Sequence, residues 1–316
     1  MYDNDSKGIS YTAGFFILIA FAVAGVFIAS LISIPVWQAM TGTSFTKMEE
    51  AMNDPANSNA VKVIQCITAI VGFLLPAIVT AFLLNRKPMK LLGFPAKINW
   101  KQIGLVCIIM VTALFVSGFF SYVNEHLPIS QSLKLRFDKM ESDYNRQVEV
   151  ILGLNNTGEY LLALLIMAFI PAICEETLFR GGLQNFLTRS TKLPWLSIAV
   201  VSILFSAAHF SYYGFLSRLF LGVLLGLLYQ VSGRLWLNII AHFFNNALAV
   251  TLIFILKQQG KPLKEAISEG SSTWLGVLAL PVVIALIIVF KKIAGKPKED
   301  AGGRMRNEEL RNTPFY

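Results

Sequence analysis

The chain has 316 residues, of which 55% are hydrophobic and only 15% carry a charge. Soluble domains carry a charge on about 25% of their residues, so this composition excludes an ordinary soluble domain and indicates a membrane protein. The formal net charge of +8 does not indicate a nucleic-acid-binding protein, because the basic residues are spread over separate loops without interleaved aromatic residues.

Eight apolar stretches are long enough to serve as membrane spans. They cover residues 11–34, 63–84, 103–123, 160–174, 193–210, 215–231, 235–256 and 272–290. The fourth stretch is short if it ends before the acidic residues that follow it, so we expect its helix to continue toward Leu187. The predicted fold class is all-α, a polytopic membrane protein with about eight transmembrane helices around a polar intramembrane cavity.

Lysine and arginine residues predict the orientation of the chain in the membrane. The loop between the second and third spans carries five of them and no acid: Arg86, Lys87, Lys90, Lys97 and Lys101. The segment after the last span opens with Lys291, Lys292, Lys296 and Lys298. Since cytoplasmic loops are enriched in basic residues, we expect both regions and both termini in the cytoplasm, and the loop at 35–62 outside. The expected location is the plasma (inner) membrane, with the first span kept as an uncleaved anchor.

No segment between the spans is large enough to fold as an independent domain, and the longest one covers residues 124–159. We therefore divide the chain into three parts. These are N-terminal membrane helices and loops at 1–150, a core with polar motifs at 151–260, and a last membrane helix with a charged tail at 261–316.

Two adjacent acidic residues, Glu175 and Glu176, follow the fourth apolar stretch. A carboxylate at bilayer depth costs about 2.5–3.5 kcal/mol, so each of them needs a partner, water or a chemical task. Arg180 lies four positions after Glu176, on the same helical face, and can neutralise it. Glu175 points about 100° away around the helix and has no local cation, so we expect it to meet a group from another span.

Three polar side chains in later spans are candidate partners: His209, His242 and Asn246. Each has an ordinary structural explanation. A lone histidine in an apolar helix often packs with its ring bonded to a backbone carbonyl, and His242 with Asn246, spaced i and i+4, can join helices by hydrogen bonds. Together with the acidic pair, however, they predict an acid/base and hydrogen-bonding site in a low-dielectric environment.

Three motifs carry these residues. They are Glu175-Glu176-Thr177-Leu178-Phe179-Arg180, Phe205-Ser206-Ala207-Ala208-His209 and His242-Phe243-Phe244-Asn245-Asn246. In this order they resemble the CPBP family of intramembrane endopeptidases, also known as the Abi or type II CAAX prenyl endopeptidase family. The resemblance covers residues 160–256. It implies a helical membrane protein whose polar cavity opens toward the cytoplasm and in which a substrate peptide is cut near its end.

The resemblance implies four catalytic residues. Glu175 would be the general base that activates water, with His209 beside it, because peptide hydrolysis needs a base to make water nucleophilic. His242 and Asn246 would donate hydrogen bonds to the oxyanion of the tetrahedral intermediate.

Further residues are expected to support the site. Glu176 and Arg180 would hold the helix as an ion pair, and Phe205 would form a wall of the cavity. The segment from Gly222 to Gly226 is expected to be a close-packing groove between helices.

A metal is the alternative to a glutamate base alone. Glu175, His209 and His242 could ligate zinc, and proteins of this pattern have long been classed as metalloproteases. However, the sequence contains no HExxH helix, and Asn246 stands where a third strong ligand would be expected. We favour a glutamate mechanism without a cofactor.

We expect a membrane-associated or lipidated peptide or protein as substrate, which reaches the site from the cytoplasm or the inner leaflet, and no nucleic acid. Two other classes stay open: a non-catalytic membrane scaffold or immunity protein, and a proton-coupled transporter in which Glu175 carries protons. A protease needs all four catalytic residues, which the chain retains. A transporter more commonly shows inverted repeats, which the sequence does not.

Overall fold

The computed structural model of the protein describes residues 4–95, 100–260 and 273–294. Within these ranges the chain is predominantly helical, with no strand and one isolated β-bridge between Ser6 and Asn85. Seven helices of the described residues are long and apolar enough to cross a membrane. The predicted all-α fold is confirmed, and the chain is a multi-pass integral membrane protein.

The long helices follow the order of the predicted spans. α1 covers Tyr11–Thr41, and the next span combines α3 (Ser58–Ala69), the π-helical η3 (Ile70–Leu74) and α4 (Leu75–Leu84). After α6 (Trp100–Glu125), the fourth span combines α8 (Thr157–Ala163), the π-helical η4 (Leu164–Phe169), α9 (Ile170–Glu176), the π-helical η5 (Thr177–Gln184) and α10 (Asn185–Thr191). It is followed by α11 (Pro194–Ala207), α12 (Phe215–Ser232), α13 (Leu235–Gln258) and α15 (Thr273–Ile293). Short helices η1 (Phe45–Lys47), α2 (Met48–Ala51), η2 (Pro55–Asn57) and α5 (Pro88–Leu92) lie between the spans.

Two of the predicted spans differ from the structure. α1 continues to Thr41, past the predicted end at residue 34, with Pro35 inside the helix. Membrane helices tolerate such a proline, because neighbouring groups and local adjustments satisfy the backbone that it frees. α11 is 14 residues long, shorter than the predicted stretch 193–210, because Pro194 starts it and the chain turns after Ala207. It is therefore a short apolar helix in addition to the seven long ones of the described residues.

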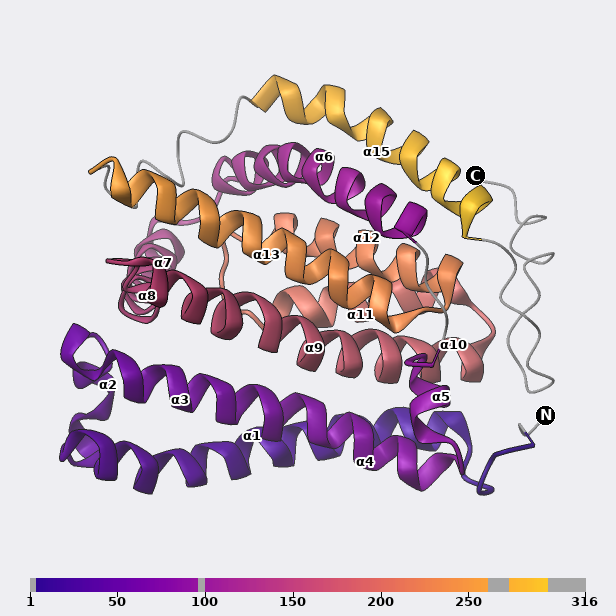
Figure 1. Ribbon diagram of the computed structural model, residues 1–316, viewed down its shortest axis with the longest axis horizontal. Helices are drawn as coiled ribbons and strands as arrows, with labels where there is room; N and C mark the ends of the chain where they lie inside the picture. The colour runs from indigo at the N-terminus through magenta and orange to yellow at the C-terminus, as the bar shows by residue number, and fades with distance from the viewer. Residues whose placement is uncertain (1–3, 96–99, 261–272, 295–316) are drawn as a thin grey trace.

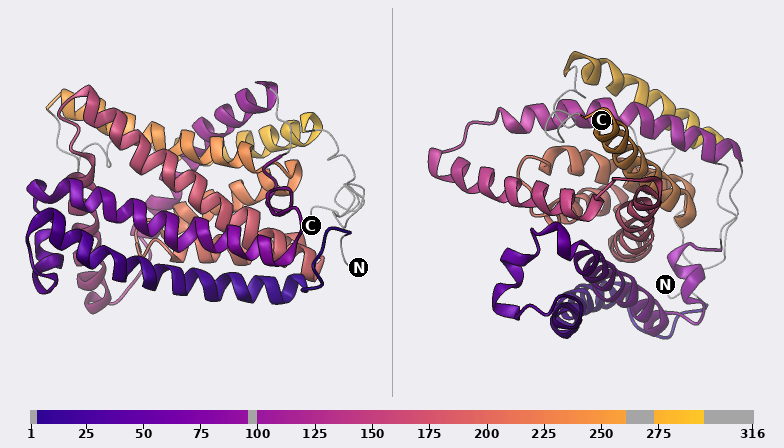
Figure 2. Two further views of the ribbon diagram at one scale, coloured as in Figure 1. Left: turned by 60° about the horizontal axis from the view of Figure 1, so that its bottom comes forward. Right: turned by 60° about the vertical axis from the view of Figure 1, so that its left-hand side comes forward.

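The helices form two groups that lie side by side (Figure 1). In one group α1 packs along α3, η3 and α4, where a Cβ on Gly25 would lie only 2.5 Å from the Val71 carbonyl oxygen. In the other, α6 packs on α12 and α13, and α15 covers α6. The fourth span joins the groups, because α10 packs on α1 and η5 on α4 (Figure 2).

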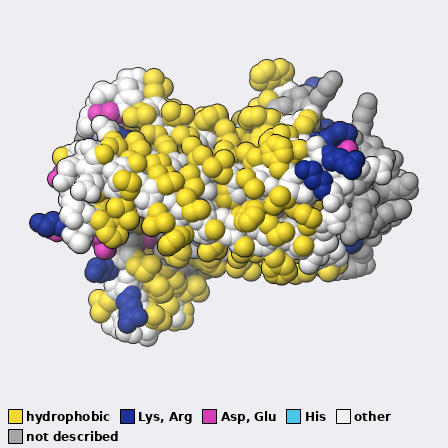
Figure 3. All heavy atoms as spheres, turned by 90° about the horizontal axis from the view of Figure 1, so that it is seen from below, with side chains coloured by type: hydrophobic (Ala, Val, Ile, Leu, Met, Phe, Trp, Pro, Cys, Tyr) yellow, Lys and Arg dark blue, Asp and Glu magenta, His cyan; other side chains and the backbone are white. Residues whose placement is uncertain are grey.

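The outer surface of the bundle is apolar over most of its length. In Figure 3, hydrophobic side chains cover the middle of the molecule, while acidic and basic side chains gather toward its ends. Large side chains such as Phe16 (63% exposed) and Phe27 (65% exposed) point outward. A bilayer is the environment that such a band matches, because hydrocarbon covers the middle and headgroups meet the charged ends.

The end of the bundle opposite to α5 (Pro88–Leu92) is covered by α7 (Gln131–Leu152), a helix within the segment 124–159 that the sequence analysis left without a structure (Figure 1). It holds the loop after α11: Ser211 Oγ donates to Glu141 Oε2 at 2.9 Å, and the Tyr213 hydroxyl donates to Asp138. This hydrogen bond is the main cause that raises the pKa of Tyr213 to about 12. The phenol therefore stays a donor at physiological pH, and α7 stays attached to the loop.

α5 lies at the other end of the bundle. Leu91 and Leu92 are buried there, and their carbonyls accept hydrogen bonds from Asn185 Nδ2 (2.7 Å) and the Tyr229 hydroxyl (3.2 Å). Of the basic residues predicted to face the cytoplasm, Lys97, Lys296 and Lys298 lie outside the described residues, as does most of the charged tail.

Candidate active site

The fourth span is one continuous helical segment from Thr157 to Thr191. The prediction that its helix continues past Glu175 and Glu176 toward Leu187 is therefore confirmed. The segment is not a regular α-helix, because η4 and η5 widen it on both sides of α9. Such π-helical turns occur frequently at functional sites, and the acidic pair stands directly before one of them.

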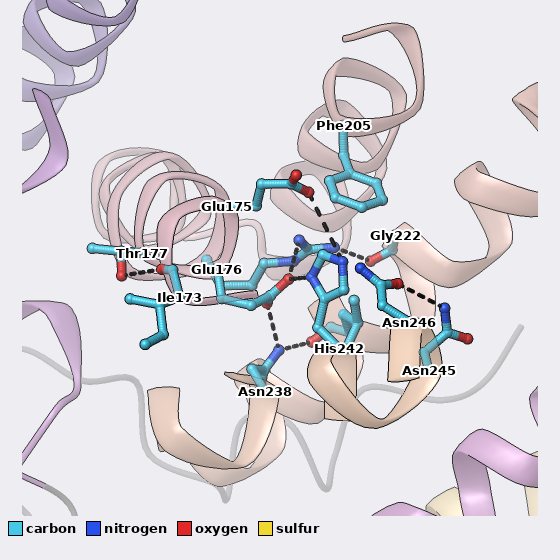
Figure 4. A network of polar contacts seen from close by, with 12 residues as sticks. Ile173, Glu175, Glu176, Thr177, Phe205, Gly222, Asn238, His242, Asn245 and Asn246 are labelled. Carbon is cyan, nitrogen blue, oxygen red and sulfur yellow. Dashed lines mark hydrogen bonds and ion pairs between the residues drawn. The ribbon is translucent and has the colours of Figure 1, made fainter. Parts of the chain in front are cut away.

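Glu176 points into the protein and is completely buried. Its Oε1 accepts hydrogen bonds from Arg180 Nη1 at 2.7 Å and His242 Nδ1 at 2.8 Å, and its Oε2 accepts one from Asn238 Nδ2 at 3.2 Å (Figure 4). The predicted ion pair between Glu176 and Arg180 is confirmed. Three donors, one of them cationic, offset the cost of taking this carboxylate out of water.

Arg180 is held by more than its ion pair. Its Nη2 donates to the Gly222 carbonyl at 3.3 Å, and its guanidinium lies over the Phe205 ring, 4.5 Å from the ring centroid. The same ring packs edge-on against both histidines, with centroid distances of 5.0 Å to His209 and 5.9 Å to His242. Phe205 thus contacts Arg180 and both histidines, and its role as a wall of a cavity stays a prediction.

Glu175 points to a different side of the helix, as expected (Figure 4). Its side chain is 15% exposed, and its Oε2 is buried without a hydrogen-bond partner among the described residues. His242 Nε2 lies 3.9 Å from this oxygen, which is too far for a hydrogen bond. His242 thus stands between the two carboxylates, bonded to Glu176 through Nδ1 and facing Glu175 with Nε2.

Asn246 lies one turn beyond His242 on the same face of α13. Its Nδ2 donates to the Met167 carbonyl at 3.3 Å, and its Oδ1 accepts from Asn245 Nδ2 at 3.1 Å. His209 follows the end of α11, and its Nδ1 lies 2.8 Å from the Phe205 carbonyl. With Nδ1 bonded to this carbonyl, Nε2 is the ring nitrogen that can serve water or a substrate.

A family model described as type II CAAX prenyl endopeptidase Rce1-like matches residues 157–248. Residues 157–248 form an Rce1-like domain. No curated protein matches the chain, and no solved structure matches it. The domain runs from the start of α8 into α13 and contains every catalytic and supporting residue that the motifs predicted. The resemblance stated from the three motifs is confirmed.

Two polar residues of the Rce1-like domain were not predicted from the sequence. Asn238 bonds to Glu176, and the buried Gln184 donates from Nε2 to the Gly226 carbonyl at 2.9 Å. Their spacing could have revealed them, because positions 176, 180 and 184 share one helical face, as do 238, 242 and 246. Buried polar residues that continue such a face in a membrane span are expected to join the same network.

The predicted close-packing groove on α12 is confirmed. A Cβ on Gly222 would lie 3.0 Å from the Ser202 Cβ, and a Cβ on Gly226 would lie 3.1 Å from Gln184 Oε1. Because neither glycine has a side chain, the neighbouring helices come close to α12. Arg180 and Gln184 can therefore reach the carbonyls of the two glycines.

The positions of Glu175, His209 and His242 bear on whether these side chains could bind zinc. Among the described residues, no group of three or more His, Cys, Asp and Glu side chains is placed to hold a metal ion. Of the predicted zinc set of Glu175, His209 and His242, the last already uses Nδ1 for Glu176. A zinc-bound histidine commonly donates its other ring nitrogen to a carboxylate, so this bond leaves Nε2 of His242 for a metal, and the zinc alternative stays a prediction.

Proposed function

We propose that the Rce1-like domain is an intramembrane endopeptidase that hydrolyses a peptide bond near the end of a membrane-associated or lipidated peptide, with Glu175 as its base. The observation that supports this most is the state of Glu175, whose Oε2 is buried without a hydrogen-bond donor among the described residues, 3.9 Å from His242 Nε2. An uncompensated carboxylate at bilayer depth is costly, and such groups generally have a chemical task.

In the proposed reaction, Glu175 accepts a proton from a water molecule while the water oxygen bonds to the carbonyl carbon of the scissile peptide. His209, which faces the same Phe205 ring as His242, holds the water through its Nε2. The proton then moves from Glu175 to the nitrogen of the leaving amine as the C–N bond breaks. The base is restored, and the products are a new carboxyl end and a new amine.

The negative charge of the tetrahedral intermediate needs donors that are in place beforehand. Asn246 can donate a second N–H, since its carboxamide is fixed by Met167 and Asn245. His242 can donate from Nε2 when both of its ring nitrogens carry a proton, with its Nδ1 held in place by the Glu176 carboxylate. One oxyanion donor contributes about 2.7–4 kcal/mol to transition-state stabilisation in comparable enzymes.

The proposed location is the plasma (inner) membrane with both termini in the cytoplasm, which the basic loop at 86–101 supports. In this orientation α5, which is held by Asn185 and Tyr229, lies at the cytoplasmic end, and α7 lies at the outer end. A substrate that moves laterally from the inner leaflet is therefore favoured over one that approaches along the bundle axis.

Single cysteines at Lys87 and Asp138, placed in a cysteine-free background, test this orientation. In intact cells an impermeant thiol reagent is expected to label position 138 and not position 87. The opposite pattern would reverse the orientation and move the substrate route to the side of α7.

Comparative proteomics of membrane peptides tests the activity itself, with cells that carry the wild-type protein, Glu175→Gln or Glu50→Gln. Glu50 is an exposed carboxylate of α2 and serves as the control. Cleavage products are expected with the wild type and with Glu50→Gln only. Products that persist with Glu175→Gln would overturn the proposal.

Two further measurements sharpen it. Synthetic peptides with and without a prenyl group define the substrate. The zinc content of the purified protein, with Glu175→Ala as control, tests the cofactor.

A further inference from the structure

The side chain of Asn246 is bonded to a backbone carbonyl inside another helix. Its Nδ2 lies 3.3 Å from the carbonyl oxygen of Met167, in η4, against which α13 packs. A carbonyl in the interior of an α-helix normally accepts from the N–H four residues later and is not offered to a side chain. The contact therefore requires a reason why Met167 is different.

Pro171 supplies this reason. It stands four residues after Met167, as the second residue of α9. Proline has no N–H, and its ring pushes away the carbonyl of the residue four positions before it. The η4 turn just before it is bonded with a wider spacing, from the Ile170 N–H to the Leu165 carbonyl. The donor that would close an α-helical turn on Met167 does not exist in this sequence, so the carbonyl can accept from Asn246.

The bond to Met167 determines how Asn246 presents its carboxamide. The amide nitrogen has two hydrogens, of which one is used on Met167, while the amide oxygen accepts from Asn245. The last torsion of an asparagine is broad, so without these two partners the amide could turn and exchange its oxygen with its nitrogen. With them, the second hydrogen has a fixed direction.

We propose that Pro171 is a positioning residue of the site. By removing the N–H that would close an α-helical turn on the Met167 carbonyl, it directs this carbonyl to Asn246, which then holds its remaining N–H ready for the oxyanion. This inference rests on the proposed endopeptidase function for its effect on rate. Its structural part, the competition between a backbone N–H and Asn246 for one carbonyl, does not depend on that function.

The substitution Pro171→Ala returns an N–H to the position opposite the Met167 carbonyl. We expect kcat to fall about tenfold, a part of the 10²–10³ that loss of a whole oxyanion donor costs, with KM little changed. The melting temperature is expected to stay the same or to rise, because the helix gains a backbone hydrogen bond. A purely structural role of Pro171 predicts the reverse: lower stability and an unchanged kcat per folded molecule.

Pro76 provides a matched control within the chain. It is also the second residue of a helix, α4, that directly follows a π-helical segment, η3. It lies in the group of α1, α3 and α4, where its ring lies beside Gly25 and its carbonyl accepts a hydrogen bond from Thr80. Pro76→Ala is therefore expected to leave kcat unchanged. An equal loss of kcat in both variants would overturn the specific role of Pro171.

A spectroscopic measurement tests the competition without any substrate. The Met167–Ala168 step is the only Met–Ala step in the sequence, so protein labelled with ¹³C at methionine carbonyls and ¹⁵N at alanine gives one bonded ¹³C–¹⁵N pair. Asn246→Ala is expected to shift this carbonyl resonance in the wild-type background and to leave it unchanged in the Pro171→Ala background. A shift of equal size in both backgrounds would refute the inference. If the proposed function is wrong, Glu175→Gln retains activity while this result stands.

Discussion

Two neighbouring carboxylates on one helix lie in opposite environments. Glu176 is fully buried and accepts three hydrogen bonds, whereas Oε2 of Glu175 accepts none among the described residues, and the Glu175 side chain is 15% exposed. Only about 100° of helical rotation separates them. A single step along the chain thus separates a carboxylate that the fold compensates from the carboxylate that we propose as the base.

The compensated face extends beyond Glu176. Arg180 and Gln184 follow at intervals of four residues, and each donates to a glycine carbonyl of α12. This face therefore attaches the fourth span to its neighbour. His242 belongs to both sides, since its Nδ1 is fixed by Glu176 and its Nε2 faces Glu175. Glu176 thereby orients the ring of His242 toward Glu175, the proposed base.

The largest effect is expected from Glu175→Gln. The amide keeps the shape of the side chain and loses its basicity, so kcat/KM should fall by about 10²–10⁴, the usual contribution of a general base. The melting temperature should not fall, because no described hydrogen bond is lost at Oε2. Rates and thermal melts of the protein in nanodiscs measure both quantities. A variant with wild-type rates would show that the two carboxylates do not differ in the proposed way.

Glu176→Gln should give the complementary result. It leaves the buried Arg180 without its counterion, and breaking a buried pair typically costs about 3–5 kcal/mol of stability. We expect a much lower yield of folded protein and a lower melting temperature in detergent. The double variant Glu176→Leu with Arg180→Leu removes both charges and should recover part of the yield.

A Glu176→Gln variant that is as stable as the wild type would contradict the structural role of this carboxylate. It would then belong with the catalytic residues, and the contrast between the two neighbours would have to be reversed or abandoned.

The parts of this contrast that were predictable from the sequence are local. The ion pair of Glu176 with Arg180 follows from their spacing on one helix, and the apolar stretches follow from the thickness of the bilayer. The partner of Glu176 on α13 was not predictable, because the distance between two spans is set by side-chain packing across the whole bundle. His242 was accordingly predicted as an oxyanion donor or a zinc ligand, and its bond to Glu176 was missed.

The same reasoning explains the errors in the elements. The first apolar stretch was predicted to end at residue 34, whereas α1 continues through Pro35 to Thr41, because a membrane helix tolerates a proline that a soluble helix would not. The length of α11 was overestimated, because the apolar residues up to Phe210 continue past the point where the helix stops. Hydropathy measures how apolar a stretch is and does not show where its backbone turns.

Asn246→Ala is expected to have a smaller effect than either glutamate variant. It removes one oxyanion donor, so the rate should fall at least about tenfold, with stability nearly unchanged because the side chain is only partly buried. Asn245→Ala is the matched neighbour: it removes the support for the Asn246 amide oxygen and should reduce the rate less. Equal rates in the two variants would show that the amide of Asn246 is not the group that acts on the substrate.

The smallest effect is expected from Asn238→Leu, which tests how complete the compensation of Glu176 is. Asn238 Nδ2 donates to Glu176 and, at 2.6 Å, to the Leu225 carbonyl, while its own Oδ1 has no partner among the described residues. Leucine removes one donor from the carboxylate but also removes this unpaired oxygen, so the net loss of stability should be only about 1 kcal/mol. Arg180 and His242 still hold Glu176, and the rate should therefore change by less than the loss seen with Asn246→Ala. Thermal melts and kcat/KM of Asn238→Leu, measured alongside those of Glu176→Gln, test both expectations. If Asn238→Leu instead abolishes activity at full stability, the buried face takes part in the reaction, and the separation of roles between Glu175 and Glu176 is wrong.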